Sequence, residues 1–174
     1  MKVLVVSDSH GDREILIELI ERYKDKVEQL FHCGDSELEA TDSVWDSMLT
    51  VRGNMDFDDE FSMTQTVEVQ NQRIFMAHGH RLDVNYTMQE LVFAAKEEHA
   101  NYAFFGHTHQ ARVEQINNIV VLNPGSISEP RGSYPFPTYA IIENDDSQVG
   151  VTYYNRAHEA IEQLSSNFSK TKKQ

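Results

Sequence analysis

Five short apolar segments of this chain are each followed closely by aspartate, asparagine or histidine. The segments are residues 2–7, 29–33, 48–51, 73–77 and 102–105. The polar residues that follow them, in chain order, are Asp8 and His10, Asp35, Asn54 and Asp56, His78 and His80, and His107 and His109. In open α/β sheets the carboxyl ends of the strands converge on one crevice, where ligands bind. The pattern therefore predicts a sheet that brings carboxylates, an amide and imidazoles to one place.

The first third of the chain alternates strand and helix signals. After the first apolar segment, Asp12 can cap a helix whose apolar residues repeat at helical spacing through about residue 24. A second helix is predicted over residues 37–47, between the strands at 29–33 and 48–51. This β-α-β-α-β order favours a parallel sheet covered by helices.

The rest of the chain predicts three hairpins and two further helices. The hairpin turns lie at residues 70–72, 117–118 and 144–148. The helices are predicted over residues 88–99 and 156–166. Together these elements predict a mixed α/β fold, a four-layer α-β-β-α sandwich of two mixed sheets flanked by helices. Because no linker, repeat or change of composition interrupts the chain, we expect one domain over residues 1–166 and a polar, frayed tail over residues 167–174.

Charge and cysteine content restrict the partners of this chain. Its net charge of -13 repels nucleic-acid backbones, so stable nucleic-acid binding is not expected. Bound cations can reverse the field inside a cleft, so a phosphate substrate remains compatible with that charge. No apolar run approaches the roughly 20 residues that span a bilayer, and no membrane association is expected. Cys33 is the only cysteine, which favours a reducing cytoplasm.

The donor atoms at the segment ends suit particular metals. Imidazole and carboxylate together favour Mn, Fe, Zn, Ni or Co over Ca and Mg, which prefer oxygen ligands alone. Glycines also stand where the backbone must turn sharply beyond a strand. They are Gly34, Gly53, Gly79 and Gly106. Each short motif alone is also typical of an ordinary turn, so the metal-site hypothesis rests on their joint order.

In that order the motifs resemble the calcineurin-like metallophosphoesterases. The family pattern runs Asp-x-His, Gly-Asp, Gly-Asn-His-Asp or Glu, His, and Gly-His-x-His. This chain supplies Asp8-Ser9-His10, Gly34-Asp35, Gly53-Asn54-Met55-Asp56, His78 and Gly106-His107-Thr108-His109. The likeness extends to Asn123-Pro124-Gly125-Ser126 and is strongest to the compact bacterial and archaeal phosphodiesterases of the family. It implies the metallo-dependent phosphatase-like form of the sandwich.

The resemblance also implies a role for each ligand. One divalent ion would be held by Asp8, His10, Asp35 and His109. The other would be held by Asp35, Asn54, His78 and His107, with Asp35 bridging the two. A hydroxide between the ions would attack the phosphorus of a small phosphoester, and Asn54 would also contact the phosphoryl group. Mn is the expected metal, with Fe, Zn, Ni and Co as the other candidates.

One position departs from the family pattern. Many members have His where this chain has Met55, and that His is assigned to stabilising the transition state or protonating the leaving group. Because a thioether can do neither, we expect diesters to be hydrolysed in preference to alkyl phosphomonoesters with poor leaving groups. His80 is a candidate proton donor near that position, and its alternative role is to support the turn after His78.

Several alternatives stay open at the level of the sequence. The same metals would serve a phosphomonoesterase or nucleotide phosphatase. A noncatalytic interaction scaffold is a second alternative, since the retromer coat contains a subunit of this fold, and a metal-stabilised module that binds an acidic metabolite is a third. The loop at 123–132 would either bring Ser126 or Arg131 to the substrate or form a structural corner. An aromatic hairpin around residues 134–154 would cover either the core or an interface in a homo-oligomer.

Overall fold

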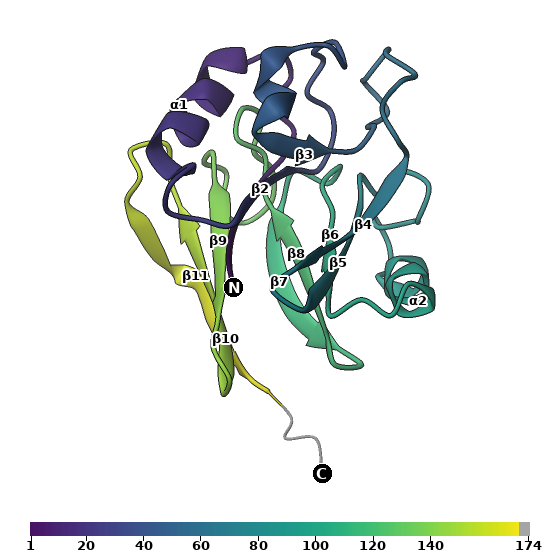
Figure 1. Ribbon diagram of the computed structural model, residues 1–174, viewed down its shortest axis with the longest axis vertical. Coiled ribbons are helices and arrows are strands. Elements are labelled where there is room, and N and C mark those ends of the chain that lie inside the picture. Colours follow the sequence, from purple (N-terminus) through teal and green to yellow (C-terminus); the bar gives the residue numbers. More distant parts are fainter. Residues whose placement is uncertain (171–174) are drawn as a thin grey trace.

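Two mixed β-sheets pack face to face at the centre of the molecule, as the computed structural model of residues 1–170 shows (Figure 1). The strands of the first sheet are β1 (Lys2–Val6), β2 (Gln29–His32), β3 (Met48–Thr50), β9 (Tyr139–Asn144), β10 (Gln148–Tyr154) and β11 (Ala160–Ser169). The strands of the second are β4 (Thr64–Val69), β5 (Gln72–Ala77), β6 (Tyr102–Phe104), β7 (Ala111–Ile116) and β8 (Ile119–Pro124). Their orders are β11-β10-β9-β1-β2-β3 and β4-β5-β6-β8-β7.

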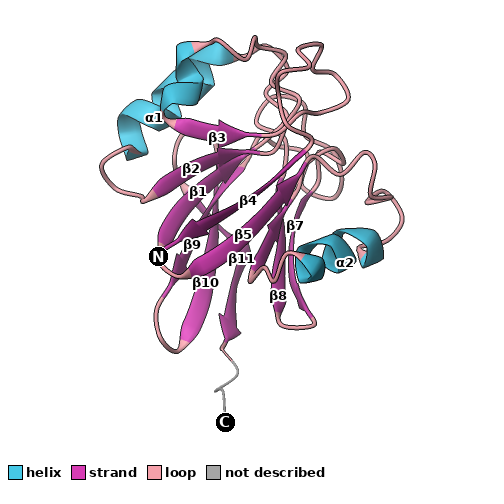
Figure 2. Cartoon of the chain, turned by 45° about the vertical axis from the view of Figure 1, so that its right-hand side comes forward, coloured by secondary structure: helices cyan, strands magenta, loops and turns pink. Residues whose placement is uncertain are grey.

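Two helices cover the outer faces of the sheets. Figure 2 shows α1 (Arg13–Tyr23) and α2 (Gln89–Glu97) on opposite sides of the molecule. Buried residues of α1 form one core cluster with the outer face of the first sheet, and buried residues of α2 form another with the second sheet. A third cluster fills the space between the sheets. The predicted α-β-β-α sandwich is confirmed.

The four residues of the central strand β1 that follow Lys2 are all apolar. Val3 and Val5 point into the core between the sheets, whereas Leu4 and Val6 point into the core under α1. Both faces of the strand are therefore buried, so no position alternates to a polar residue. β1 pairs in parallel with β2 and antiparallel with β9, so the carboxyl ends of β1 and β2 lie at the same edge of the sheet.

Most local signals of the sequence are confirmed. Asp12 caps α1, and its carboxylate accepts a hydrogen bond from the N–H of Ile15 (3.3 Å). The hairpins β4–β5 and β7–β8 turn through Gln70-Asn71 and Asn117-Asn118, all four with positive φ, which suits the tight turns of twisted hairpins. In the described part of the chain, no helix has the length and hydrophobicity that crossing a membrane requires.

The helix predicted over residues 37–47 is wrong. Within this range the chain forms only a short 3-10 turn, η1 (Ser43–Asp46). Glu37 has φ 56, which an α-helix cannot include. The side chains of Asp56 and Asp58 also accept the N–H groups of Glu37 and Ala40 (2.8 and 2.7 Å). Distant carboxylates therefore organise this segment as a loop.

The helix predicted over residues 156–166 is also wrong, because that segment forms most of β11. Ile161, Leu164 and Phe168 are spaced like one face of a helix, but all three contact the core between the sheets. An irregularity in the pairing explains the spacing: Tyr153 pairs with Ile161, whereas Val151, two residues earlier, pairs with Ser166. β11 runs to Ser169, past the predicted start of the tail, and residues 171–174 lie outside the described residues.

Candidate metal centre

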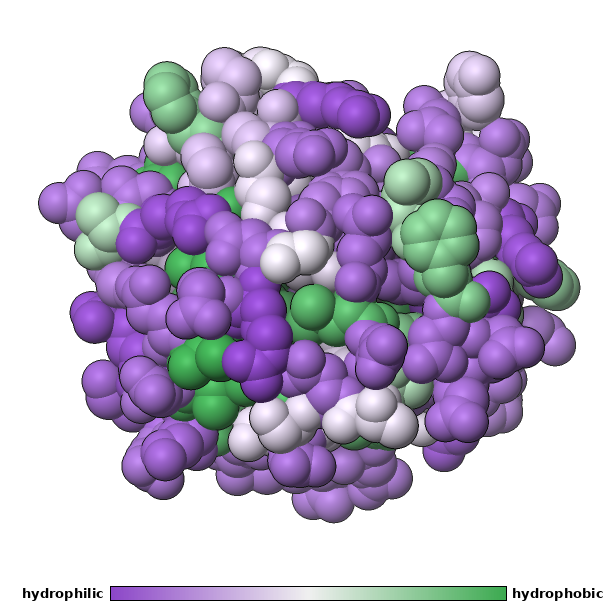
Figure 3. All heavy atoms as spheres, turned by 90° about the horizontal axis from the view of Figure 1, so that it is seen from above, coloured by the Kyte–Doolittle hydropathy of each residue, from purple (hydrophilic) through white to green (hydrophobic). Residues whose placement is uncertain are grey.

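The loops after β1, β2, β3, β5 and β6 bring all seven predicted ligands to one end of the molecule. Figure 3 shows this end from above, the top of Figure 1, and its surface is mostly hydrophilic with small hydrophobic areas near the middle. Asp8, Asp35, His78 and His109 are buried, and the other three predicted ligands, His10, Asn54 and His107, are partly or more fully exposed. The site is therefore set into the surface with one side open.

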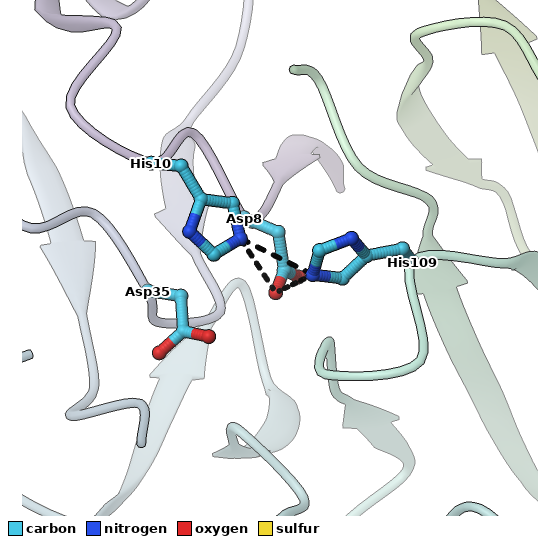
Figure 4. A group of neighbouring side chains, drawn as sticks. All are labelled: Asp8, His10, Asp35 and His109. Atoms are coloured by element: carbon cyan, nitrogen blue, oxygen red, sulfur yellow. Dashed lines mark hydrogen bonds and ion pairs between the residues drawn. The ribbon is translucent and has the colours of Figure 1, made fainter. Parts of the chain in front are cut away.

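The first group of ligands has the composition expected of the first ion. The donor atoms of Asp8, His10, Asp35 and His109 all lie within 4.8 Å of one another. Figure 4 shows His10 and His109 turned toward the Asp8 carboxylate from opposite sides, with Asp35 beside them. The Nε2 atom of His109 lies 3.1 Å from Asp8 Oδ1, and the Nε2 atom of His10 lies 3.9 Å from it.

The second group lies directly beside the first. The Nε2 atom of His78 is 3.2 Å from Asp35 Oδ2 and 3.0 Å from the Asn54 amide oxygen. The Nδ1 atom of His107 is 2.9 Å from the same Asn54 oxygen. Asp35 thus contacts this group as well as belonging to the first, which is the position a bridging carboxylate requires.

The histidines are oriented by their second ring nitrogens. His109 Nδ1 donates to the Glu129 carbonyl (2.6 Å), and His78 Nδ1 donates to the Cys33 carbonyl (2.7 Å). His10 Nδ1 donates to the Glu37 carboxylate (2.9 Å). Metal-ligating histidines typically donate their second N–H to a carboxylate or carbonyl in this way, which leaves Nε2 free to bind the metal.

The contacts among His10, His109 and Asp8 depend on which ring nitrogens carry the imidazole protons. The Nε2 atoms of His10 and His109 lie 3.2 Å apart. If both imidazoles are neutral, with their protons on Nδ1, neither Nε2 atom can donate to the other. Asp8 Oδ1, which faces these rings, is buried and has no hydrogen-bond partner in the described part of the chain. A cation among these atoms would satisfy all three, so the residues present fit a divalent metal.

The titration behaviour of the group reflects the same clustering of charge. Burial alone would raise the pKa of Asp8, but His109, His78 and Ser7 outweigh it, and the pKa lies below its ordinary value. Burial would lower the pKa of His78, but Asp35 and Asp8 outweigh it, and the pKa is raised. The buried carboxylates and the imidazoles beside them therefore stabilise each other's charged forms.

The backbone at the ligands is strained. Five of the predicted ligands have positive φ although none is glycine: Asp8, His10, Asp35, His107 and His109. Such a conformation costs on the order of 1 kcal/mol or more per residue and concentrates at functional sites. The chain maintains this strain where it turns each donor inward.

Two of the glycines flanking the ligands are required by close approach rather than by φ. A Cβ atom on Gly53 would lie 2.0 Å from Asp35 Oδ1 and 2.4 Å from the Asp35 backbone nitrogen. A Cβ atom on Gly106 would lie 2.5 Å from Asp8 Oδ2. Gly34 and Gly79, by contrast, have positive φ (97 and 109), as the predicted sharp turns require. Gly53 and Gly106 thus leave space for a ligand beside the backbone, whereas Gly34 and Gly79 allow the backbone of the ligand loops to turn.

Asp56 braces the loops that carry the ligands. Its buried carboxylate accepts the backbone N–H groups of Asp35 (2.8 Å), Gly53 (2.6 Å) and Glu37 (2.8 Å), and the hydroxyl of Ser36 (3.3 Å). The loop after β2 is thereby joined to the loop after β3. Asp56 therefore supports the backbone of the loops that carry the predicted ligands, and it is not part of the group of side chains that could hold a metal.

The loop after β8 forms a structural corner. Ser126 is fully buried, and its hydroxyl donates to the Asp8 carbonyl (2.8 Å). Asn123 donates to the Gly106 carbonyl (2.8 Å), which supports the loop that carries His107 and His109. The alternative in which Ser126 approaches the substrate is therefore wrong.

Other histidines near the site differ in their surroundings. His32 is fully buried, and burial lowers its pKa to about 4, so it packs as a neutral ring and its Nε2 contacts the hydroxyl of Ser9 (2.9 Å). The ring of His80 lies 5.5 Å from that of His78 and 6.2 Å from that of His107. Its Nδ1 atom is buried with no partner in the described part of the chain. Burial and the neighbouring His78 lower the pKa of His80.

Several supporting residues have no signature in the sequence. The carbonyls of Cys33 and Glu129 could belong to any residue type, so no side-chain pattern identifies them. Glu37 and Asn85 reach the ligands from loops, and Asn85 Nδ2 lies 3.1 Å from His107 Nε2. Of these supporting residues, only Glu37 closely follows a strand, β2, so only Glu37 fits the sequence pattern that identified the predicted ligands.

Comparison with known sequences shows that the chain is similar to phosphoesterases. The family model of the calcineurin-like phosphoesterase superfamily domain matches residues 1–147. The probable metallophosphoesterase YsnB of Bacillus subtilis is 34% identical over 164 residues, which cover 94% of this chain and 96% of that protein. The phosphodiesterase YfcE of Escherichia coli is 28% identical over 171 residues, and the match covers 83% of this chain and 89% of YfcE.

Solved structures agree with the sequence relatives. A Streptococcus pneumoniae protein described as a predicted phosphoesterase is 40% identical, with a TM-score of 0.95 over 97% of both chains. Vacuolar protein sorting 29 of Cryptosporidium parvum is 20% identical, with a TM-score of 0.76 over 97% of this chain and 98% of that chain. The second likeness shows a shared fold only.

Proposed function

The chain belongs to the calcineurin-like phosphoesterase superfamily and is a metal-dependent phosphoester hydrolase, and on that premise we propose that it hydrolyses phosphodiesters at the cluster described above. The observation that carries this assignment is the convergence of nitrogen and oxygen atoms that can bind a metal. The Nε2 atoms of His10 and His109 face each other at 3.2 Å beside the unpartnered Asp8 Oδ1. We propose that the seven ligands bind two divalent ions, with Asp35 shared between them.

Hydrogen bonds within the protein fix the orientation of the predicted ligands without a substrate. Divalent cations bound there would lower the pKa of water and neutralise charge that develops on the phosphoryl oxygens. His10, His78 and His109 are fixed by hydrogen bonds so that each presents Nε2. Asn54 is exposed at the mouth of the site, where its amide can contact the phosphoryl group. We propose Mn on the basis of the family resemblance, and the mixed nitrogen and oxygen set is also compatible with Fe, Zn, Ni or Co.

A diester is favoured over an alkyl monoester because its single negative charge opposes attack by hydroxide less, and because the chain lacks an obvious acid for a poor leaving group. Met55 follows Asn54, and its side chain is 41% exposed beside the site. A thioether cannot donate a proton. The related protein YfcE is described as a phosphodiesterase, which supports the same preference. His80 is the remaining candidate to contact the leaving oxygen, since its buried Nδ1 has no partner in the described part of the chain.

The alternatives differ in what they leave unexplained. A phosphomonoesterase or nucleotide phosphatase would use the same ions, and it requires an acid that Met55 does not supply. A noncatalytic scaffold would not need all seven ligands, yet the structure brings every one of them together. We therefore propose catalysis, on a small phosphoester.

Location and assembly follow from fewer observations. We propose a reducing, cytoplasmic environment because Cys33 is buried and its thiol is free. We propose a single domain that extends beyond the expected end at residue 166 to Ser169, because the three core clusters share the two sheets and β11 ends at Ser169. The aromatic hairpin partly covers the core, and Phe136 stays 58% exposed, so a homo-oligomer is compatible with the fold.

The proposed function is tested with purified protein stripped of metal and reloaded with single cations. We expect no hydrolysis without metal, and with Mn we expect bis(p-nitrophenyl) phosphate to be cleaved faster than p-nitrophenyl phosphate and glycerol 2-phosphate. Faster turnover of the glycerol ester than of the diester would exclude the diesterase assignment. No hydrolysis of any ester with any cation would favour the scaffold.

Met55→His is expected to restore activity on poor leaving groups. A positioned acid contributes typically about 10²–10⁴-fold, so we expect turnover of glycerol 2-phosphate to rise about tenfold or more. Cleavage of bis(p-nitrophenyl) phosphate should change little, because nitrophenolate leaves without protonation. The measurement is kcat/KM for both substrates. The control is Phe57→His, which adds a histidine at a neighbouring side chain that is 85% exposed; an equal rise in both variants would contradict the role of position 55.

A further inference from the structure

A small cavity opens beside the second ligand group. It has a volume of about 280 Å³ and is lined in part by Arg52, Asn54, His80 and Arg81. Asn54 belongs to the proposed metal site, so the cavity borders the place where the phosphoryl group would bind. A substituent of that phosphoryl group would lie close enough to enter the cavity.

The arginines of this cavity stand apart from most others in the chain. In the described residues, four arginines form ion pairs with carboxylates: Arg13, Arg73, Arg112 and Arg156. Arg22 lies over the ring of Tyr23. Among residues 1–170, the arginines without such a pairing are Arg52, Arg81 and Arg131. Two of them line the cavity, and the backbone N–H of the third donates to the His109 carbonyl (2.9 Å). The arginines without an ion pair in this acidic protein thus lie in the segments around the site.

The local contacts leave the charge of the cavity available. The guanidinium group of Arg52 donates only to backbone carbonyls, those of Asp56 (3.3 Å) and Phe57 (3.4 Å). Asp56 also lines the cavity, but its carboxylate already accepts three backbone N–H groups and one hydroxyl. Those bonds occupy the acceptor positions of Asp56, and among the described residues no ion pair joins it to either arginine. The cavity therefore presents two guanidinium groups, one carboxylate whose acceptor positions are occupied, and one unpartnered imidazole nitrogen, on His80.

We propose that Arg52 and Arg81 bind an anionic group carried by the second substituent of the substrate. The inference rests on the proposed function and names its substrate class: phosphodiesters in which one ester substituent carries its own phosphate or carboxylate. Guanidinium groups bind such anions through paired, charge-assisted hydrogen bonds. In a chain of net charge -13, these positive groups would also draw a multiply charged ester to the correct side of the metal centre.

The test compares two substrates that differ by one remote phosphate. They are the p-nitrophenyl ester of thymidine 5′-phosphate and the same compound with an added 3′-phosphate. Both release nitrophenolate, which is measured with the Mn-loaded protein. Hydrogen bonds to charged groups predict that kcat/KM is higher for the 3′-phosphorylated substrate by about 10- to 100-fold. Arg81→Gln is expected to bring this ratio close to one.

Matched variants separate binding from structural damage. Arg52→Lys should keep part of the preference and Arg52→Gln should lose it, because lysine keeps the charge without the paired donors. Arg112→Gln removes an arginine that is paired with Glu114 away from this cavity and should leave the ratio unchanged. Calorimetric titration of thymidine 3′,5′-bisphosphate and thymidine 5′-phosphate provides a second readout. The unmodified protein should bind the bisphosphate more tightly than the monophosphate, and the Arg52→Gln and Arg81→Gln variants should bind the two with similar affinity.

The outcomes distinguish this inference from the function it rests on. No cleavage of either substrate would overturn the proposed function and the inference together. Equal cleavage of both would overturn the inference and leave the diesterase assignment standing. A preference that persists in both Arg81→Gln and Arg52→Gln would place the anion elsewhere and overturn the assignment to this cavity.

Discussion

Asp35→Asn is expected to reduce phosphodiester hydrolysis by about 10³-fold or more. Asp35 lies within 4.8 Å of the other donors of the first group and 3.2 Å from His78 of the second, so both proposed ions depend on it. Metal ions contribute several kcal/mol of transition-state stabilisation, and each 1.36 kcal/mol is tenfold in rate. The substitution keeps the shape of the side chain, so the amide oxygen can still accept the N–H of Met55.

The controls for this variant concern folding and charge. Asp46→Asn makes the same chemical change at an exposed position of η1 and should leave the rate unaltered. Circular dichroism should show that metal-free Asp35→Asn is folded, and the rise in Tm on adding Mn should shrink. A variant that keeps wild-type kcat and wild-type stabilisation by Mn would show that Asp35 does not bridge the ions.

Asp56→Ala is expected to have the largest effect on stability among the residues around the site. The change leaves three backbone N–H groups without an acceptor: those of Asp35 and Gly53, which are buried, and that of Glu37, which is partly buried. Each unsatisfied group costs about 1–3 kcal/mol, so the free energy of unfolding should fall by roughly 3 kcal/mol or more. For a domain of this size that lowers Tm by roughly 6–12 °C. Metal affinity should fall as well, because the backbone of Asp35 loses its support.

Asp58→Ala is the matched comparison. Asp58 also accepts two backbone N–H groups, those of Ala40 (2.7 Å) and Glu60 (3.0 Å), but it is not buried. Water can replace those bonds, so the expected loss is below about 1 kcal/mol. Urea denaturation of both variants measures the difference. Equal losses of stability would contradict the bracing role assigned to Asp56.

The strands were predictable because burial leaves a direct record in their residues. The four residues of β1 after Lys2 are all apolar since both faces of the strand are covered there. The turn at Gln70-Asn71 was predictable because a two-residue hairpin loop favours residues that tolerate positive φ. In these elements local preference and tertiary environment agree.

The two wrong helices lie where distant contacts decide the local structure. Residues 37–47 have no helix because Asp56 and Asp58, which come later in the chain, accept their N–H groups. The spacing of Ile161, Leu164 and Phe168 looks helical, and the irregular pairing of β10 with β11 places all three against the core. No short window of sequence contains that information.

The site was predictable in its ligands and not in its supports. Each ligand follows a strand, and parallel strands bring their carboxyl ends together, so the convergence followed from order alone. The atoms that orient the histidines are mostly backbone carbonyls, such as those of Cys33 and Glu129, which any residue type could provide. The positive φ of Asp8 or His107 is likewise invisible, because these residue types usually adopt negative φ.

Anomalous diffraction from crystals of the Mn-loaded protein tests the central claim most directly. We expect two peaks in each molecule, one among Asp8, His10, Asp35 and His109 and one among Asp35, Asn54, His78 and His107. Both peaks should contact Asp35, and the second should disappear first when Asn54 is replaced by Ala. A single peak, or peaks away from these side chains, would contradict the assignment of a two-metal phosphodiesterase centre.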